Sequence, residues 1–279
     1  MAPTGSLILV STPIGNLGDL SPRATDTLAR VGVIACEDTR HTRKLLTHAG
    51  ISGKRLLAVH EHNEAGQVAH VLGLLDRGVD VAVVTDAGTP GISDPGTRLV
   101  VAAAGAGARV EVVPGPSALV AALVLSGLPT ARFCFEGFLP RKGRERAERL
   151  GAIAAERRTT VLYEAPHRLE ATLGDLLAAC GPLRLVAVAR ELTKLHEEVW
   201  RGTLDGALAR ARESAPRGEH VLVVAGAGGP EPASDEQVEA AVAAKPSRWW
   251  RPSWVCPSAG STTPPCASGS DPPGGAIYG

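Results

Sequence analysis

The chain has 279 residues, of which 44% are hydrophobic and 3% aromatic, and its formal net charge is +0 at pH 7. This length supports one or two globular domains. A neutral balance excludes a general attraction to nucleic acid, so any such binding needs a local basic patch. No apolar run reaches 18 residues, and the start MAPTG lacks the regions of a signal peptide, so we expect a cytoplasmic protein. The five Cys have no paired metal spacing and predict neither a disulfide framework nor a zinc site.

Strand, turn and helix alternate five times in the first 125 residues. Short apolar runs predict strands at Ser6–Val10, Val31–Cys36, Leu56–Val59, Val81–Val84 and Arg109–Val113. Ser21 before Pro22 predicts a helix start, with the serine as N-cap, and Asp94 before Pro95 predicts another. The alternation predicts an α/β fold with a mostly parallel sheet covered on both faces.

The stretch Val81 to Gly96, VAVVTDAGTPGISDPG, is the most informative of these units. Its apolar strand runs into a sharp turn, in which Gly88 and Gly91 can take backbone angles that other residues avoid. Such turns place backbone N–H groups at the carboxyl edge of a sheet, where open α/β sheets bind ligands. The loop after the first strand does not match the GxGxxG fingerprint of dinucleotide sites.

Polar side chains follow the second and third strands. Glu37 and Asp38 either cap the next helix or belong to a polar site. The run from His60 to Glu64, HEHNE, contains two His and two Glu, which raises the alternative of a metal site. Its spacing is not HExxH, and alternate residues of an extended loop point apart. We therefore expect a hydrogen-bonding or capping loop and no metal.

The second half of the chain changes character. Apolar runs at Thr159–Tyr163, Leu185–Ala189, Glu198–Arg201 and His220–Ala225 predict hairpin-like pairs and a mixed sheet. Pro-Gly-Pro at residues 114–116 predicts a boundary between an N-terminal α/β domain, residues 1–114, and a C-terminal α/β domain, residues 115–230. The basic segment PRKGR, residues 140–144, has no acid to balance it and is a candidate phosphate-contacting loop.

Residues 231–279 are expected to form a short helix at Asp235–Ala244 and then a disordered tail. After Lys245 the composition breaks, with three of the four Trp and many Pro in a segment without period. Our hypothesis is that the reading frame departs from the ancestral one near Lys245. A DNA read across that codon that gives the same frame, also found in close relatives, would contradict it.

Eight motifs in order resemble the ribosomal RNA small-subunit methyltransferase I family, within the tetrapyrrole methylase superfamily. They are VSTPIGNLGDLSPRA, CEDTRHTRKLL, HEHNE, TDAGTPGISDPG, PGPSA, GFLPRKGR, YEAPHR and RELTKLHEEVWRG. The resemblance runs from about Ser6 to Ala227, and the tail after about Ala244 does not share it. It implies 2′-O-methylation of a cytidine in 16S rRNA of the small ribosomal subunit.

The resemblance also implies a two-domain fold with S-adenosylmethionine (SAM) bound in the cleft between the domains. Thr89 stands where distant tetrapyrrole methylases have Asp, so no carboxylate contact is carried over to it. The residues implied in cofactor binding lie on the turns described above and beside them: Pro13, Gly15, Asp86, Ala87, Gly88, Thr89, Ile92, Ser93, Ser117, Ala118 and Tyr163. From the superfamily alone we expect a homodimer.

A ribose 2′-hydroxyl is a weak nucleophile, and a nearby base helps to remove its proton. The candidates are the strand-end acids Asp38, Glu61 and Glu64, while positioning without a dedicated base stays open. The basic residues expected to contact RNA are Arg40, Arg141, Lys142, Arg144, Arg168 and Lys194.

Two other functions compete with this expectation. A methylase of a small tetrapyrrole would not need the basic PRKGR segment. A non-catalytic RNA- or ribosome-binding protein that kept the fold would not need intact cofactor turns. RNA binding that weakens steeply with salt would argue against the small-molecule methylase, because it indicates several contacts with phosphates. Failure to bind SAM would favour the non-catalytic protein.

Overall fold

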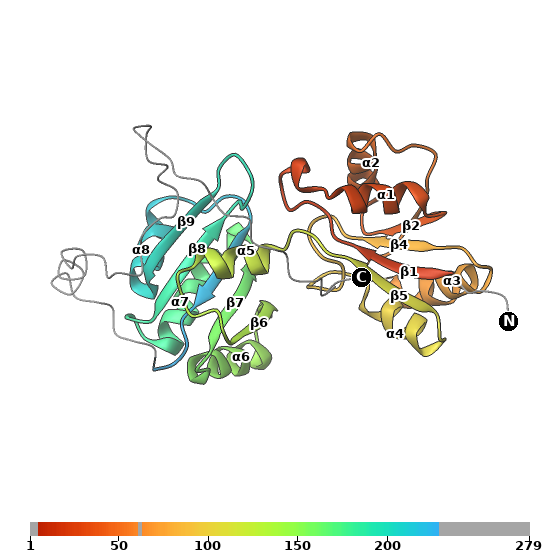
Figure 1. Ribbon diagram of the computed structural model, residues 1–279. Coiled ribbons are helices and arrows are strands. Elements are labelled where there is room, and N and C mark those ends of the chain that lie inside the picture. The colour runs from red at the N-terminus through yellow and green to blue at the C-terminus, as the bar shows by residue number, and fades with distance from the viewer. Residues whose placement is uncertain (1–4, 61–62, 229–279) are drawn as a thin grey trace, which may run out of the picture. The chain divides into compact units, whose positions relative to one another are not determined.

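The computed structural model describes residues 5–60 and 63–228, which form two five-stranded sheets (Figure 1). Glu61, the expected helix at residues 235–244 and the tail lie outside the described residues. The predicted boundary near Pro114 falls between the two sheets, and residues 1–230 group as one unit, so the division into two domains stays a prediction. Among the described residues, none of the helices has the length and apolarity needed to cross a membrane.

The first sheet is entirely parallel, as predicted from the alternation of its elements. It consists of β1 (Ser6–Val10), β2 (Val33–Cys36), β3 (Arg55–Ala58), β4 (Val81–Val84) and β5 (Arg109–Val113). Their order is β3-β2-β4-β1-β5, and each neighbouring pair runs parallel. The second strand begins at Val33 and not at Val31, because the backbone N–H of Val31 still belongs to the last turn of the preceding helix.

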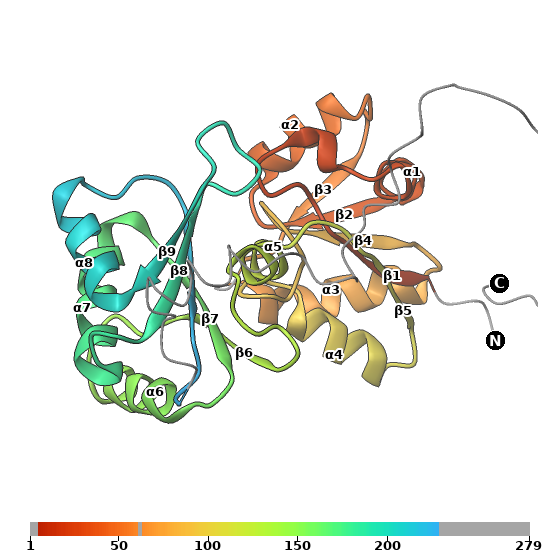
Figure 2. The same ribbon diagram turned by 60° about the vertical axis from the view of Figure 1, so that its left-hand side comes forward.

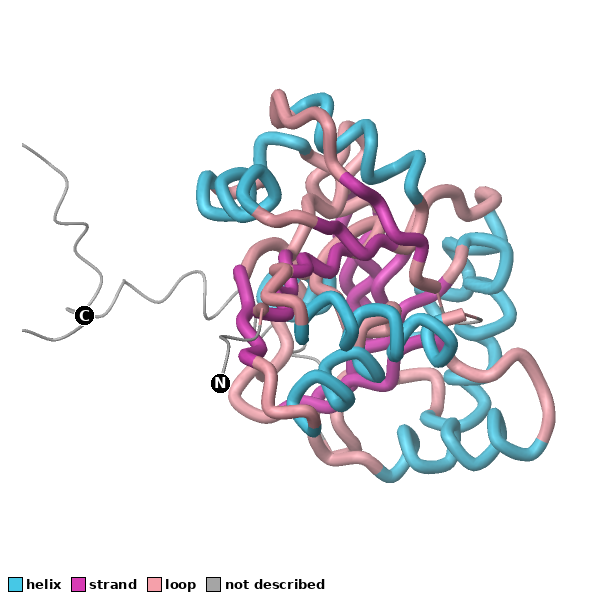
Figure 3. The backbone as a smooth tube through the Cα atoms, turned by 90° about the vertical axis from the view of Figure 1, so that its right-hand side faces the viewer, coloured by secondary structure: helices cyan, strands magenta, loops and turns pink. Residues whose placement is uncertain are grey.

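Helices cover both faces of this sheet (Figure 1), and the tube view shows its strands lying between helices (Figure 3). They are α1 (Pro22–Arg30), α2 (Thr39–His48), α3 (Glu64–Asp76) and α4 (Thr97–Gly105). Successive strand residues alternate between the two layers: Ile8 and Val10 pack with α1 and α2, whereas Leu7 packs with α3 and α4. Burial on both faces explains why these strands read as continuous apolar runs.

The chain reverses its direction of travel across the sheet between β1 and β4. These two strands are neighbours, but β1 continues into α1 on one face and β4 continues into α4 on the other. This is a topological switch point, where open α/β sheets bind ligands beyond the carboxyl ends of the strands. Thr12 and Gly88, in the two turns, exchange backbone hydrogen bonds of 2.9 and 3.1 Å.

The second sheet is mixed, which confirms the prediction for this half. It consists of β6 (Phe133–Phe138), β7 (Thr159–Glu164), β8 (Leu185–Arg190), β9 (Glu198–Thr203) and β10 (His220–Val224). The order is β6-β7-β10-β8-β9, with β6 and β7 parallel and the other pairs antiparallel. The helices α6 (Arg144–Ala155), α7 (Leu169–Cys180) and α8 (Leu204–Glu213) cover one face, and α5 (Ala118–Leu125) covers the other (Figure 2).

The start of α4 differs from the sequence prediction. Asp94 does not cap the helix, which begins at Thr97 after Gly96, a residue with no side chain to offer. The buried carboxylate of Glu64 takes that role and accepts N–H bonds from Gly96, Arg98 and Leu99 at 3.0, 2.9 and 3.3 Å. A carboxylate at a helix N-terminus satisfies unpaired donors and complements the helix dipole. Asp94 is therefore not needed as the N-cap of α4.

Candidate active site

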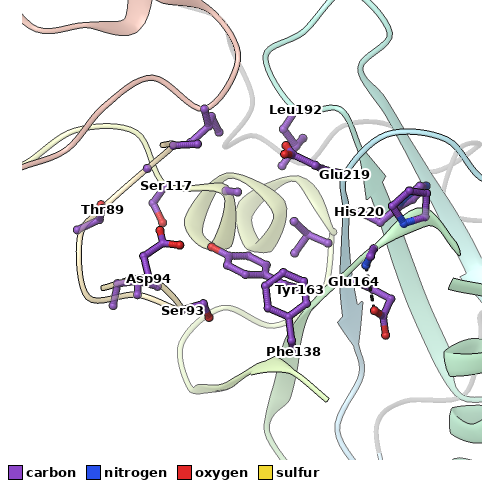
Figure 4. Close-up of a pocket in the computed structure, with 18 residues that line it drawn as sticks. Thr89, Ser93, Asp94, Ser117, Phe138, Tyr163, Glu164, Leu192, Glu219 and His220 are labelled. Atoms are coloured by element: carbon purple, nitrogen blue, oxygen red, sulfur yellow. Dashed lines mark hydrogen bonds between the residues drawn. The ribbon is translucent and has the colours of Figure 1, made fainter. Parts of the chain in front are cut away.

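A cavity of about 270 Å³ opens at the switch point and extends onto the second sheet (Figure 4). Its lining comes from seven segments of the chain, spread from the loop after β1 to β10. The residues are Ile14, Ala87, Gly88, Thr89, Ile92, Ser93, Asp94, Ser117, Ala118, Phe138, Tyr163, Glu164, Ala165, Pro166, Leu192, Glu219, His220 and Val221. The volume is near the lower end of small-molecule sites, which is about 300 Å³.

Three turns at the edge of the first sheet are tied together beside this cavity. Gly88 has φ +81°, which a glycine adopts without steric cost. The next residue, Thr89, places its hydroxyl 3.0 Å from that of Ser11 after β1 and donates to the carbonyl of Pro116 after β5 at 3.4 Å. The hydroxyl of Thr89 therefore links the turns after β1, β4 and β5.

Backbone strain concentrates around the cavity. Among the described residues, the non-glycine residues with positive φ are Ser93 (62°), Glu191 (49°) and Thr193 (66°). Ser93 lines the cavity, and the other two flank Leu192, which also lines it. Such conformations cost about 1–3 kcal/mol each and persist where the surrounding structure enforces them, often at functional sites.

One wall of the cavity is aromatic. The ring of Tyr163 packs edge-on against Phe135 and Phe138, with centroids 5.0 and 5.6 Å apart. Its hydroxyl accepts the backbone N–H of Leu119 in the first turn of α5 at 3.2 Å. Burial raises the pKa of Tyr163, so the side chain is a neutral phenol at physiological pH.

Asp94 is the acid in the cavity with an unusual environment. Burial raises the pKa of its carboxyl to about 7, the negative charges of Glu37 and Asp86 add to that rise, and a hydrogen bond with Thr85 opposes it. In Figure 4 its carboxyl points toward the space between Ser117 and Tyr163.

The other two acids that line the cavity are held by partners. Glu164 is 2% exposed, accepts N–H of Ala165 at 2.9 Å and lies 3.2 Å from the guanidinium of Arg168. Glu219 is largely exposed and pairs with the ammonium of Lys194 at 2.8 Å.

Eight of the eleven residues expected to bind the cofactor line this cavity: Ala87, Gly88, Thr89, Ile92, Ser93, Ser117, Ala118 and Tyr163. The remaining three do not. Pro13 and Asp86 line a neighbouring cavity of about 230 Å³, in which Asp86 lies 3.1 Å from Nδ1 of His41. Gly15 lies against the side chain of Lys194, since a Cβ on Gly15 would be 2.4 Å from its Cγ.

The three acids expected as bases are placed differently. Asp38 caps α2 by accepting N–H of Arg40, and its hydrogen bonds with the Arg40 guanidinium hold the pKa of its carboxyl well below the usual range. Glu64 is buried and committed to α4. Glu61 lies outside the described residues. Neither Asp38 nor Glu64 lines the cavity.

Of the six basic residues expected to contact RNA, some are exposed without an ion pair among the described residues and others are bound to acids. Arg141 and Lys142 are exposed, and the described part of the chain offers them no ion pair. Arg144 pairs with Glu148 at i,i+4, so one member of the basic segment does have an acid to balance it. Arg40 is bound to Asp38, and Lys194 to Glu191 and Glu219. Arg168 is mostly buried and donates to the carbonyl of Leu139 at 2.7 Å.

Sequence reasoning missed four important parts of the cavity: Asp94, Phe138, Leu192 and Glu219. Asp94 had a signal, since it lies in the most informative turn, but the capping rule gave it another role. Phe138 had a signal in the cluster of all three Phe between residues 133 and 138. Leu192 and Glu219 had none, because only the folding of the second sheet brings them to the cavity.

Comparisons with known proteins place this architecture. The chain resembles uroporphyrin-III-C-methyltransferase from Thermus thermophilus, with TM-score 0.57 and 25% identity, over 79% of this chain and 94% of that one. A second structure of such an enzyme, complexed with S-adenyl homocysteine, matches with TM-score 0.55 and 18% identity, over 78% and 96%. The parallel sheet followed by a mixed sheet is therefore a fold that this chain shares with these methyltransferases.

Sequence relatives narrow the class. Residues 6–208 match the family of Tetrapyrrole (Corrin/Porphyrin) Methylases. The ribosomal RNA small subunit methyltransferase I of Synechocystis sp. is 55% identical over 223 residues, 80% of each chain. The protein of the same name from Escherichia coli O157:H7 is 48% identical over 224 residues, 80% of this chain and 78% of the relative. The chain belongs to the tetrapyrrole methylase family, in its ribosomal RNA small subunit methyltransferase I branch.

The residues of the cavity fit SAM, the cofactor expected from the resemblance. SAM carries an adenine ring with apolar faces, a positive sulfonium and an ammonium. Ile14, Ile92 and Leu192 offer apolar surface, while Asp94 and Glu219 offer negative charge. The start of α5 has no side-chain cap, and apart from the N–H of Leu119, which donates to the Tyr163 hydroxyl, its first N–H groups can meet polar groups of a ligand.

Proposed function

We propose that this protein transfers a methyl group from SAM to the ribose 2′-oxygen of a cytidine in 16S rRNA of the small ribosomal subunit. The observation that carries the proposal is the close relation, over four fifths of the chain, to proteins named as methyltransferases of small-subunit ribosomal RNA. The cavity at the switch point supports it, because it combines apolar walls with negative charge at the place where this fold binds ligands.

The chemistry needed from the protein is mainly positioning. SAM supplies an activated methyl group when bound. The chain must hold the acceptor hydroxyl in line with that group and exclude water, and alignment of this kind supplies much of a rate enhancement. The turns that frame the cavity are held by Thr89 and by the backbone bonds of Thr12 with Gly88, so its geometry is set before a ligand arrives.

Arg141 and Lys142 are the best candidates for contacts with RNA phosphates. Both are exposed and precede α6, and neither has an ion pair to break among the described residues. Arg40, Arg144 and Lys194 can contribute only by exchanging an acid for a phosphate. Arg168 holds Glu164 and the end of β6 and is better explained as a structural residue.

The test is methyl transfer from labelled SAM to small ribosomal subunits from a strain that lacks the corresponding gene, followed by mapping of the modified nucleotide. Label on a ribose 2′-oxygen of a 16S cytidine is the expected result. Ala87→Trp, which fills the cavity from an exposed turn residue, should abolish both SAM binding and label while the protein still folds.

Other outcomes separate the competing functions. Label on an added tetrapyrrole but not on RNA would favour a small-molecule methylase. RNA binding without SAM binding would favour a non-catalytic protein that kept the fold.

We propose further that the protein acts in the cytoplasm as a homodimer of two-domain subunits. The support for a dimer is α5, which is apolar around its whole circumference and leaves Val120 and Val124 52% and 64% exposed. An all-apolar helix is normally covered on every side.

A further inference from the structure

A second cavity, of about 230 Å³, adjoins the switch-point cavity described above. In the loop after β1, Pro13 lines the second cavity and its neighbour Ile14 lines the switch-point cavity. In the turn after β4, Asp86 lines the second cavity and its neighbour Ala87 lines the switch-point cavity. The same two segments thus form walls of both, so a group bound in the second cavity lies beside the occupant of the first.

His41 and Asp86 form a pair in the second cavity. Nδ1 of His41, in the first turn of α2, lies 3.1 Å from Oδ2 of Asp86. The other carboxylate oxygen of Asp86 accepts the backbone N–H of Asp38 at 3.1 Å, which fixes this side chain from a second direction. A carboxylate can only accept hydrogen bonds, so it favours the imidazole form with hydrogen on Nδ1 and leaves Nε2 of His41 as an acceptor.

The charged groups around His41 come from each element beside it. Glu37 and Asp38 lie between β2 and α2, and Asp38 also holds the guanidinium of Arg40. Asp86 follows β4, and Lys44 lines the second cavity from α2. The loop after β1 contributes uncharged residues: Thr12, Pro13 and Leu17. The three carboxylates favour an imidazole that gains a positive charge when it takes a proton.

The pair can be reached by a large acceptor. The side chain of His41 is 58% exposed and that of Asp86 33% exposed. Lys44 is exposed at the same cavity, where its ammonium can meet a phosphate of a nucleic acid strand. By contrast, Asp38 and Glu64, which were expected as bases, are committed to N–H groups at helix starts.

We propose that the second cavity receives the acceptor ribose and that Nε2 of His41 accepts the proton of its 2′-hydroxyl, with Asp86 positioning the imidazole. The proposal rests on the proposed function, since it presumes a hydroxyl acceptor. The bond that forms joins the hydroxyl oxygen to the methyl carbon, and the bond that breaks is the carbon–sulfur bond, whose electrons remain on the sulfur. The proton passes from His41 to water, which restores the base.

The kinetic test compares the wild type with His41→Asn, on small ribosomal subunits as substrate. The amide nitrogen of Asn can still donate to Asp86, whereas the acceptor nitrogen Nε2 is lost. We expect kcat to fall about 100- to 10,000-fold, the usual contribution of a general base, while Tm and the Kd for SAM stay close to those of the wild type. His48→Asn, at the other end of α2 and exposed, is the matched control and should behave as the wild type.

The pH profile separates a base from a residue that only supports the fold. The wild-type kcat should rise with pH, because the imidazole must be neutral to accept a proton, and this rise should be absent in His41→Asn. Asp86→Asn removes a negative charge that stabilises the imidazolium, so the rise should move to lower pH. Variants that change the rate but leave the shape of the profile unchanged would make the pair structural and overturn the proposal.

A second measurement does not depend on activity. Nitrogen NMR of the histidine side chains should show His41, identified by its absence in His41→Asn, as a neutral imidazole with hydrogen on Nδ1 at alkaline pH. A neutral form with hydrogen on Nε2 would overturn the proposal, because that nitrogen could not accept the hydroxyl proton.

The remaining outcomes separate the base from the proposed function. An active wild type beside an equally active His41→Asn variant would overturn the base alone. Loss of SAM binding in that variant would assign the second cavity to the cofactor and not to the acceptor. A wild type that methylates no ribosomal RNA would overturn the proposed function and the base with it.

Discussion

At the scale of single residues, the ionisation of Asp94 should make the stability of the protein depend on pH. Its pKa is about 7 in the folded protein and near 3.9 in an unfolded chain, so the folded state binds the extra proton between these values. Stability therefore falls as pH rises from about 4 to 7, the reverse of a salt-bridged Asp. We predict that Asp94→Asn raises Tm by roughly 2–6 °C at pH 8 and changes it little at pH 4. Calorimetric scans at both pH values check this, and an equal effect at the two would contradict it.

Glu64 should act on stability and only indirectly on activity. Its buried carboxylate satisfies three N–H groups at the start of α4, and their loss leaves buried donors unpaired. We predict that Glu64→Ala lowers the free energy of unfolding by about 2–4 kcal/mol, and Glu64→Gln by less, because an amide oxygen still accepts. Urea unfolding measures both. A fully stable Glu64→Ala variant without activity would restore the catalytic expectation.

At the scale of elements, the connection after β5 packs closely against the end of β1 beside the cavity. A Cβ on Gly115 would lie 2.9 Å from Cβ of Ser11, at the end of β1. We predict that Gly115→Val lowers the free energy of unfolding by about 1–3 kcal/mol and weakens SAM binding, because both turns border the cavity. Gly174→Val, in an open position on α7, is the control and should be close to neutral. Equal effects of the two variants would exclude a packing cause.

The exposed side of α5 should determine the oligomeric state. Charges placed at Val120 and Val124 would be buried unpaired in a dimer interface. We predict that the double variant Val120→Asp/Val124→Asp is a monomer while the wild type is a dimer, as measured by light scattering after gel filtration. Leu183→Asp, at another exposed apolar position, should not change the mass. A dimeric double variant would move the interface elsewhere.

At the scale of the whole molecule, zero net charge means that RNA affinity depends on a local group of cations. Each phosphate contact contributes about 0.7 to 0.9 to the slope of log K against log salt. We predict that Arg141→Ala/Lys142→Ala reduces that slope by about 1–2 in filter-binding titrations with small subunits. Arg109→Ala, which removes an exposed cation paired with Glu111 at the start of β5, should leave it unchanged. A slope unaffected by the double variant would exclude these two residues.

The predicted elements and the observed fold also show which features follow from short-range sequence patterns. The two sheets and most of their strands were predicted, because apolar runs, glycine turns and Ser-Pro starts act over a few residues. Eight of the eleven expected cofactor residues meet in one cavity, and seven of them do so for the same reason: they follow the carboxyl ends of the parallel strands β4 and β5. The eighth, Tyr163, comes from β7 of the second sheet. The prediction that Asp94 caps α4 was wrong, because the carboxylate that caps this helix belongs to Glu64, more than thirty residues away in the chain.

The sequence by itself determined the fold class, the family and the turns that build the cavity, since these follow from short-range patterns and motif order. Only the tertiary structure decided which of the acids Asp38, Glu64 and Asp94 are bound at helix starts and which one lines the cavity. Asp38 and Glu64 are bound to N–H groups, while Asp94 is left among like charges. The reason is physical: the proton affinity of a carboxyl depends on burial and on charges brought close by folding. No local pattern records those distances.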